Sequence, residues 1–102
     1  MTVPISSGPT SPRPVSSGTA VKIRYFAGAR AAAGVADEDL LLDTSEPTVA
    51  LVVSTIGERH GDKLGKVLAA SSFLLDGVAV RDTSTLVPAG SQLDVLPPFA
   101  GG

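Results

Sequence analysis

The chain of 102 residues contains no cysteine and only one histidine, His60. The absence of cysteine excludes disulfide bonds, cysteine-ligated metal centres and a thiol nucleophile, and it is compatible with a reducing cytoplasm. A histidine near the end of a predicted helix more often caps carbonyl groups or packs against neighbours than acts in catalysis. We therefore expect no metal site and a cytoplasmic location.

The sequence also lacks an excess of basic charge and a long hydrophobic run. Its formal net charge is −2 at pH 7, with the basic residues spread along the chain. This balance argues against binding to nucleic acid or to an anionic lipid surface. No apolar run approaches the roughly 18 residues of a membrane-spanning helix. The composition leaves a single small domain as the expected organisation.

The first twenty residues contain four prolines, two glycines, five serines and three threonines, and their only charged side chain is that of Arg13. Such a segment cannot bury enough apolar surface to offset the entropy cost of ordering it. It has no apolar stretch after a basic start, as a secretory signal would. We predict a disordered arm over residues 1–19, a folded domain over residues 20–96 and a tail over residues 97–102.

The spacing of apolar residues predicts the secondary structure of the domain. Apolar residues follow Thr48, a suitable N-cap, at helical spacing until Gly61, which predicts the main helix. Asp76-Gly77 supplies the positive φ angles that a two-residue hairpin turn needs. The other predicted elements are strands at 21–25, 37–43 and 92–96, a helical turn at 27–33, a shorter helix at 62–70, and hairpin strands at 72–75 and 78–80.

This order of elements is compatible with an α+β fold of the β-grasp, or ubiquitin-like, type, in which a mixed sheet packs on one main helix. The first and last strands are expected to pair in parallel at the centre of the sheet. Periodicity alone does not separate this fold from other small α+β folds. The residues predicted to form the core are Val49, Val52, Val53 and Ile56 on the helix, and Val21, Ile23, Leu93 and Val95 on the sheet.

The chain ends in the sequence LPPFAGG. The carboxylate of Gly102 is unhindered and ionised at neutral pH, so it can attack the α-phosphate of ATP and become an acyl-adenylate. Gly101 and Gly102 let an extended backbone enter a channel that a Cβ atom would block. Pro97 and Pro98 favour extended geometry, and Phe99 is a natural anchor for a partner's groove. A chain end without function is the plain alternative.

Other polar groups have simpler interpretations. Asp37, Glu38 and Asp39 have the charge to bind a cation, but a solvated acidic segment is the favoured prediction. Lys22 and Arg24, on the solvent side of the first predicted strand, serve either solvation or the docking of a partner.

Three segments, together with the predicted main helix between them, resemble the MoaD/ThiS sulfur-carrier family, and most closely the small subunits of molybdopterin synthase. They are VKIRYFAGARAAAG near the start, the Asp76-Gly77 hairpin, and PAGSQLDVLPPFAGG at the end. The resemblance covers about residues 20–102. Its specific part is the strand that runs into LPP-x-x-GG, combined with the FAGAR segment after the first strand. The ending FAGG replaces the commoner VSGG of the family.

The resemblance implies a β-grasp fold and a cycle of three steps. A ubiquitin-activating-like adenylyltransferase consumes ATP to adenylate Gly102, and a sulfur donor converts the adenylate to a thiocarboxylate. The tail then inserts into the large subunit of molybdopterin synthase, where sulfur passes to a pterin precursor. The chain would be a co-substrate without a catalytic side chain or a permanently bound cofactor. The residues implied to contact partners are Pro97, Pro98, Phe99, Ala100 and Gly101.

Two other function classes stay open. The chain could carry sulfur for thiamine or cysteine synthesis, or modify proteins by joining Gly102 to lysines. It could also be a plain binding module whose tail is incidental. A neighbouring gene for a large synthase subunit would separate the molybdopterin carrier from other carriers. An exchange of one oxygen for one sulfur, seen in the mass of protein from cells, would separate a carrier from a binding module.

Overall fold

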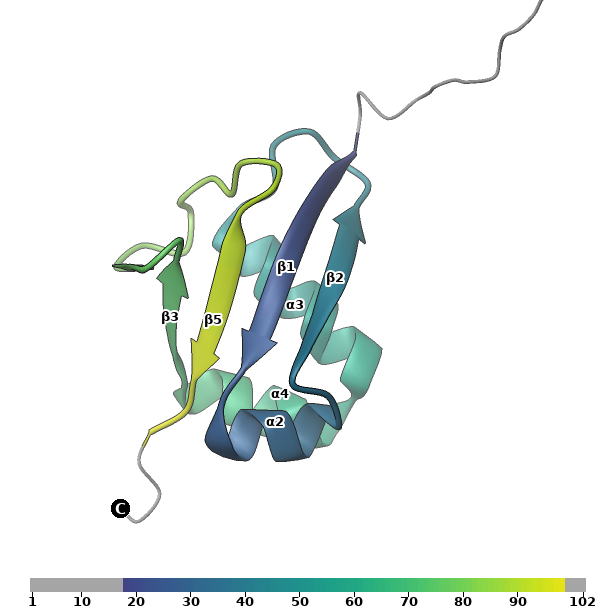
Figure 1. The fold of residues 1–102 in the computed structure, drawn as a ribbon, viewed down its shortest axis with the longest axis vertical. Helices are drawn as coiled ribbons and strands as arrows, with labels where there is room; N and C mark the ends of the chain where they lie inside the picture. The colour runs from purple at the N-terminus through teal and green to yellow at the C-terminus, as the bar shows by residue number, and fades with distance from the viewer. Residues whose placement is uncertain (1–17, 99–102) are drawn as a thin grey trace, which may run out of the picture.

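Three helices and five strands follow one another in residues 18–98, the part of the chain that the computed structural model describes (Figure 1). Most of the predicted arm and residues 99–102 of the predicted tail lie outside this range. None of the helices within it is long and apolar enough to cross a membrane. In chain order the elements are β1 (Thr19–Tyr25), α2 (Ala27–Ala33), β2 (Asp37–Leu42), α3 (Val49–His60), α4 (Asp62–Ala70), β3 (Ser72–Leu75), β4 (Val78–Ala79) and β5 (Gln92–Leu96).

The strands form one mixed sheet in the order β2-β1-β5-β3-β4. The first and last strands, β1 and β5, pair in parallel at its centre as predicted, with Ile23 opposite Leu93 and Tyr25 opposite Val95. β2 runs antiparallel to β1, and β3 runs antiparallel to β5. In Figure 1, α3 and α4 lie behind the sheet and α2 lies at its lower end. Among residues 18–98, no helix covers the front face.

α3 forms where the helical spacing predicts it. The Thr48 hydroxyl accepts a hydrogen bond from the Leu51 N–H at 3.2 Å and so caps the first turn. The helix stops before Gly61, whose φ of 90° leaves the helical region. Its side chains at Val49, Val52 and Ile56 are fully buried, whereas Val53 is only partly buried against the core. The sheet contributes Val21, Ile23, Tyr25, Leu40, Leu42, Leu93 and Val95 to the same core.

The hairpin between β3 and β4 turns through Asp76 and Gly77. Their φ angles are 49° and 86°, and the two positive values agree with the predicted turn. The Asp76 carboxylate also accepts the Gln92 N–H at 2.9 Å, which ties the hairpin to the beginning of β5. The hairpin therefore holds the strand that leads to the tail.

Candidate functional site at the base of the C-terminal tail

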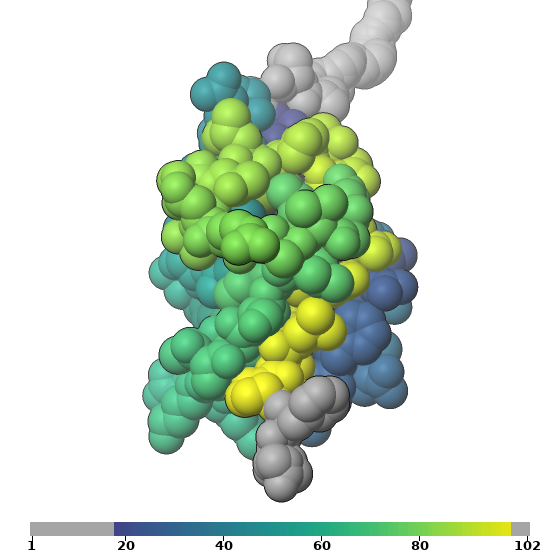
Figure 2. Space-filling model, turned by 90° about the vertical axis from the view of Figure 1, so that its left-hand side faces the viewer, coloured from purple at the N-terminus to yellow at the C-terminus, as the bar shows by residue number. Residues whose placement is uncertain are grey.

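The predicted tail leaves the fold from the end of β5. Leu96 and Pro97 are half-buried there and Pro98 is exposed. In Figure 2 the end of β5, in yellow, reaches the surface between the green segments and the blue of β1 and α2. The other predicted site residues, Phe99, Ala100, Gly101 and Gly102, lie outside the described residues. The structure thus locates the base of the tail, while the role of Gly102 stays a prediction.

Backbone hydrogen bonds hold β5 on both sides close to its end. On one side Leu96 pairs with Ser72 of β3. On the other side the Phe26 N–H donates to the Val95 carbonyl oxygen at 3.2 Å. Pro97 has no backbone N–H to donate, so it cannot extend this hydrogen-bonding pattern. The tail therefore begins directly at a fixed, central strand.

An ion pair lies at the base of the tail on the helix-free face of the sheet. The Arg24 Nε donates to the Asp94 Oδ1 at 3.0 Å, and the exposed fractions of the two side chains are 43% and 9%. The Arg24 guanidinium carbon lies 5.1 Å from the centre of the Phe26 ring, within the roughly 6 Å of a cation–π contact. The sequence left Arg24 open between solvation and docking, and the structure places its side chain against β5.

The chain turns sharply where β1 ends beside this ion pair. Ala27 has a φ of 49°, in the left-handed region that costs a residue with a Cβ atom roughly 1–2 kcal/mol. α2 begins there and ends at Gly34, whose N–H donates to the Arg30 carbonyl oxygen at 2.8 Å. The FAGAR segment therefore directs the chain away from the sheet next to the base of the tail.

A second polar group, which we call the Glu38 cluster, lies on the inner face of the sheet and consists of Tyr25, Glu38, Arg59 and His60. The Glu38 Oε2 accepts the Tyr25 hydroxyl at 2.5 Å and lies 2.5 Å from the His60 Nε2. The Glu38 Oε1 lies 3.4 Å from the Arg59 Nε. The Tyr25 and His60 rings meet edge to face, with their centres 5.8 Å apart. The cluster joins β1, β2 and the end of α3.

The contacts of the Glu38 cluster set the ionisation of two of its members. Burial would raise the pKa of Glu38, but the hydrogen bonds from Tyr25 and His60 and the charges of His60 and Arg59 outweigh it and lower that pKa. Burial, and next the hydrogen bond to Glu38, raise the pKa of Tyr25 far above its usual value. Glu38 is therefore a charged acceptor at neutral pH, and Tyr25 is a protonated donor.

The prediction of a solvated acidic segment was wrong for Glu38. Alternate residues of a strand face opposite sides, so in β2 Glu38 shares the inner face with Leu40 and Leu42. The side chain of Glu38 is only 14% exposed. The alternation of residues 38, 40 and 42 could have indicated that Glu38 faces inward. Nothing in the neighbouring sequence indicated His60 as its partner.

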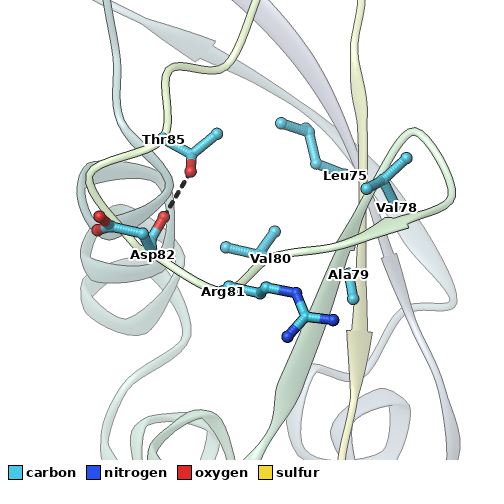
Figure 3. A pocket seen from close by; sticks show the side chains of 7 residues that line it. All are labelled: Leu75, Val78, Ala79, Val80, Arg81, Asp82 and Thr85. Carbon is cyan, nitrogen blue, oxygen red and sulfur yellow. Dashed lines mark hydrogen bonds between the residues drawn. The ribbon is translucent and has the colours of Figure 1, made fainter.

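A shallow pocket of about 370 Å³ lies beside the β3–β4 hairpin (Figure 3). Leu75, Val78 and Val80 form its apolar wall. The Asp82 carboxylate at its edge accepts the N–H and the hydroxyl of Ser84, and these bonds lower the pKa of Asp82. None of the residues predicted to act in function lines this pocket.

A family model matches the sequence, and solved structures match the fold. Residues 23–102 match the model described as the ThiS family. A putative molybdopterin converting factor, subunit 1, from Pyrococcus furiosus has a TM-score of 0.70 and 26% identity, covering 79% of this chain and 99% of that chain. No curated protein matches the chain.

Two further solved structures are similar in fold alone. Small archaeal modifier protein 1 from Methanosarcina acetivorans has a TM-score of 0.69 and 22% identity, covering 83% of this chain and 98% of that chain. The complex of subunits 1 and 2 of molybdopterin-converting factor from Helicobacter pylori has a TM-score of 0.58 and 18% identity, covering 82% of this chain and all of the matched chain.

Proposed function

The chain belongs to the ThiS family, and from this premise we propose that it carries sulfur on Gly102 for the synthesis of molybdopterin. The family match and the mixed five-stranded sheet confirm the predicted β-grasp fold. The observation that carries the proposal is the connection between fold and tail. A central strand that is hydrogen-bonded on both sides leads directly into Pro97-Pro98 and the Gly-Gly sequence.

The proposed chemistry begins at the Gly102 carboxylate. One of its oxygens attacks the α-phosphorus of ATP and displaces pyrophosphate, which gives an acyl-adenylate with AMP as a good leaving group. A hydrosulfide equivalent from the sulfur donor then displaces AMP and leaves a thiocarboxylate. Transfer of the sulfur to the pterin precursor and addition of water restore the carboxylate. The chain supplies the acyl group and its placement, and it is a co-substrate rather than an enzyme.

Three partners follow from this cycle. An adenylyltransferase activates Gly102, a sulfur donor loads it, and a large subunit receives the tail and binds the pterin precursor. The Helicobacter structure, in which subunit 1 is bound to subunit 2, supports the large subunit as a partner. The Pyrococcus protein, described as a putative subunit 1, supports the same assignment. Because the cycle consumes ATP, we propose that it takes place in the cytoplasm.

The fold that the chain shares with small archaeal modifier protein 1 favours protein modification as the second candidate. Both candidates use the same activated Gly102, and they differ in the group that attacks it. In the carrier a hydrosulfide equivalent attacks, and the sulfur then passes to a pterin precursor within a large subunit. In the modifier a lysine amine of a target protein attacks and displaces the activating group.

The direct test is ATP–pyrophosphate exchange with the activating enzyme, using protein from the native gene whose intact mass shows Gly102 as the last residue. Deleting Gly102, or adding one alanine after it, should abolish exchange and leave the melting temperature unchanged. A chain that lacks residues 1–17 is the matched control and should exchange normally. Exchange by the Gly102 deletion would refute the proposed mechanism. Sulfur transfer to the pterin precursor, compared with the formation of lysine conjugates, separates the two candidates.

A further inference from the structure

The carboxylate of Asp94 is nearly buried although it lies on the helix-free face of the sheet. Its side chain is 9% exposed, and in the register it lies opposite Arg24 of β1 and Leu74 of β3. A buried carboxylate loses hydration and needs a charged or hydrogen-bonding partner. The Arg24 Nε, at 3.0 Å, supplies it. The ion pair therefore joins β1 to β5 at Asp94, two residues before Leu96, the last residue of β5.

The side chain of Arg24 connects three places around the base of the tail. It extends from β1, bonds to Asp94 of β5, and lies against the ring of Phe26, the residue at which β1 leaves the sheet. Phe26 in turn donates its N–H to the Val95 carbonyl oxygen. Within residues 18–98, Lys22 lies two positions earlier on the same face opposite Gln92 and forms no ion pair. The ion pair therefore occurs only at the tail end of the β1–β5 pair.

We propose that Arg24, Asp94 and Phe26, which we call the tail bracket, fix the direction in which the tail leaves β5. This inference rests on the proposed carrier function. Arg24 and Asp94 are positioning residues, because they act through the backbone of β5 and not on the reacting carbon of Gly102.

The length of the tail makes its starting direction matter. An extended tail over residues 97–102 spans about 20 Å, at roughly 3.3 Å per residue. A rotation of about 10° at Leu96 would therefore displace the end of an extended tail by about 3–4 Å. A displacement of this size leaves fewer tails aligned with the partner's channel before docking, so docking is weakened while the docked tail reacts as before. Without the bracket, the partner must order the base of the tail as well as its end.

The test compares Arg24→Gln, Asp94→Asn and the double variant in the full chain, with Lys22→Gln as the matched control. The double variant leaves no unpaired buried charge, so it tests the proposal even if a single variant fails to fold. The first measurement is the NMR order parameter of the Leu96 amide. It should fall in the single variants and fall no further in the double variant, because residues of one network are not additive. The control should leave it unchanged.

The second measurement uses the same proteins prepared as C-terminal thiocarboxylates. The assay measures the rate of sulfur delivery as a function of the concentration of the large subunit. The concentration that gives half the maximal rate should rise about three- to tenfold in the bracket variants, because binding must then also order the base of the tail. The maximal rate should stay within about twofold, since high partner concentration still fills the site. Phe26→Leu, which keeps apolar volume but removes the aromatic face, should give an intermediate change.

Three results would overturn the tail bracket. The first is an unchanged Leu96 order parameter, and the second is an altered order parameter with unaltered delivery. The third is an effect of Arg24→Gln that Asp94→Asn does not share, which would mean that Arg24 contacts the partner directly. The NMR measurement needs neither ATP nor a partner, so failure of wild-type protein to be adenylated would refute the carrier function without deciding the bracket.

Discussion

Replacing Glu38 by glutamine removes one negative charge from the inner face of the sheet and leaves the size of the side chain unchanged. Glu38 accepts hydrogen bonds within the Glu38 cluster from groups that are largely buried, since Tyr25 is 1% exposed and the His60 side chain 16%. Hydrogen bonds to a charged group contribute about 1.5–3 kcal/mol, against about 0.5–1.5 kcal/mol for neutral pairs. Losing the charge should therefore cost about 1–1.5 kcal/mol at each of two bonds.

We therefore expect Glu38→Gln to lower the free energy of unfolding by about 2–3 kcal/mol at pH 7. Arg59 adds little to this value, because its side chain is 51% exposed and solvent screens the pair. A small domain has about 5–15 kcal/mol of stability in total. At roughly 4–8 °C for each kcal/mol, the melting temperature should fall by about 10–20 °C.

The difference between wild type and Glu38→Gln should depend on pH in a defined direction. The folded state lowers the pKa of Glu38 below its ordinary value of 4.5. The stability that the charged carboxylate contributes is therefore fully present above pH 4.5 and is lost as the pH falls through the lower pKa of the folded state. Urea unfolding at several pH values between about 3 and 7 should show the two proteins converging in acid.

The control for this experiment is Asp39→Asn, which removes the same charge from the exposed side of the same strand. It should change the free energy of unfolding by less than about 0.5 kcal/mol. The reasoning would be refuted if Glu38→Gln were equally small at pH 7, or if its effect persisted undiminished in acid.

Three other changes test the core and the tail. Ile56→Ala should lower the free energy of unfolding, measured in urea, by about 2–5 kcal/mol, because Ile56 is fully buried. Ser54→Ala, on the exposed side of α3, is the control and should change it little. If Ile56→Ala were as stable as wild type, Ile56 would not belong to the core. Gly101→Val should keep the wild-type melting temperature, because residue 101 follows β5 in the sequence. It should strongly reduce sulfur delivery, because its Cβ atom would block a channel that admits only glycine. Normal delivery by this variant would contradict a narrow channel. Phe99→Ala should weaken docking while a preformed thiocarboxylate stays reactive at high partner concentration. Activity that no partner concentration restores would exclude the anchor role of Phe99.

The elements of this fold could be predicted because their signals are local. Helical spacing after Thr48 and the Asp76-Gly77 pair each act within a few residues, and the structure has the helix and the turn at those places. The start of the domain depends on a distant contact instead. Thr19, which the sequence assigned to the arm, is the first residue of β1, and its hydroxyl donates to the Thr44 carbonyl oxygen at 2.7 Å.

The contacts between polar side chains could not be predicted from the sequence. The alternation of residues along a strand shows which face a side chain is on, but the pairing of distant elements decides which side chains meet. Alternation places Arg24 and Asp94 on the same face of their strands, but they are 70 residues apart and meet only because β1 and β5 pair in one particular register. Glu38 and His60 are 22 residues apart on different elements. Local patterns in a single sequence do not reveal such pairings, although the sequence contains every side chain that takes part.

The parallel pairing of β1 with β5 also determines when, during synthesis of the chain, the sheet can be completed. Of the five strands in the described residues, β5 leaves the ribosome last, yet its place lies between β1 and β3, inside the sheet. Closing this contact requires a loop of almost the whole domain, and contacts of such long sequence separation slow folding. A nascent or prematurely ended chain without β5 has two separate strand pairs with open edges, which invite aggregation. The base of the tail therefore forms only after all five described strands have been synthesised and β5 has paired between β1 and β3.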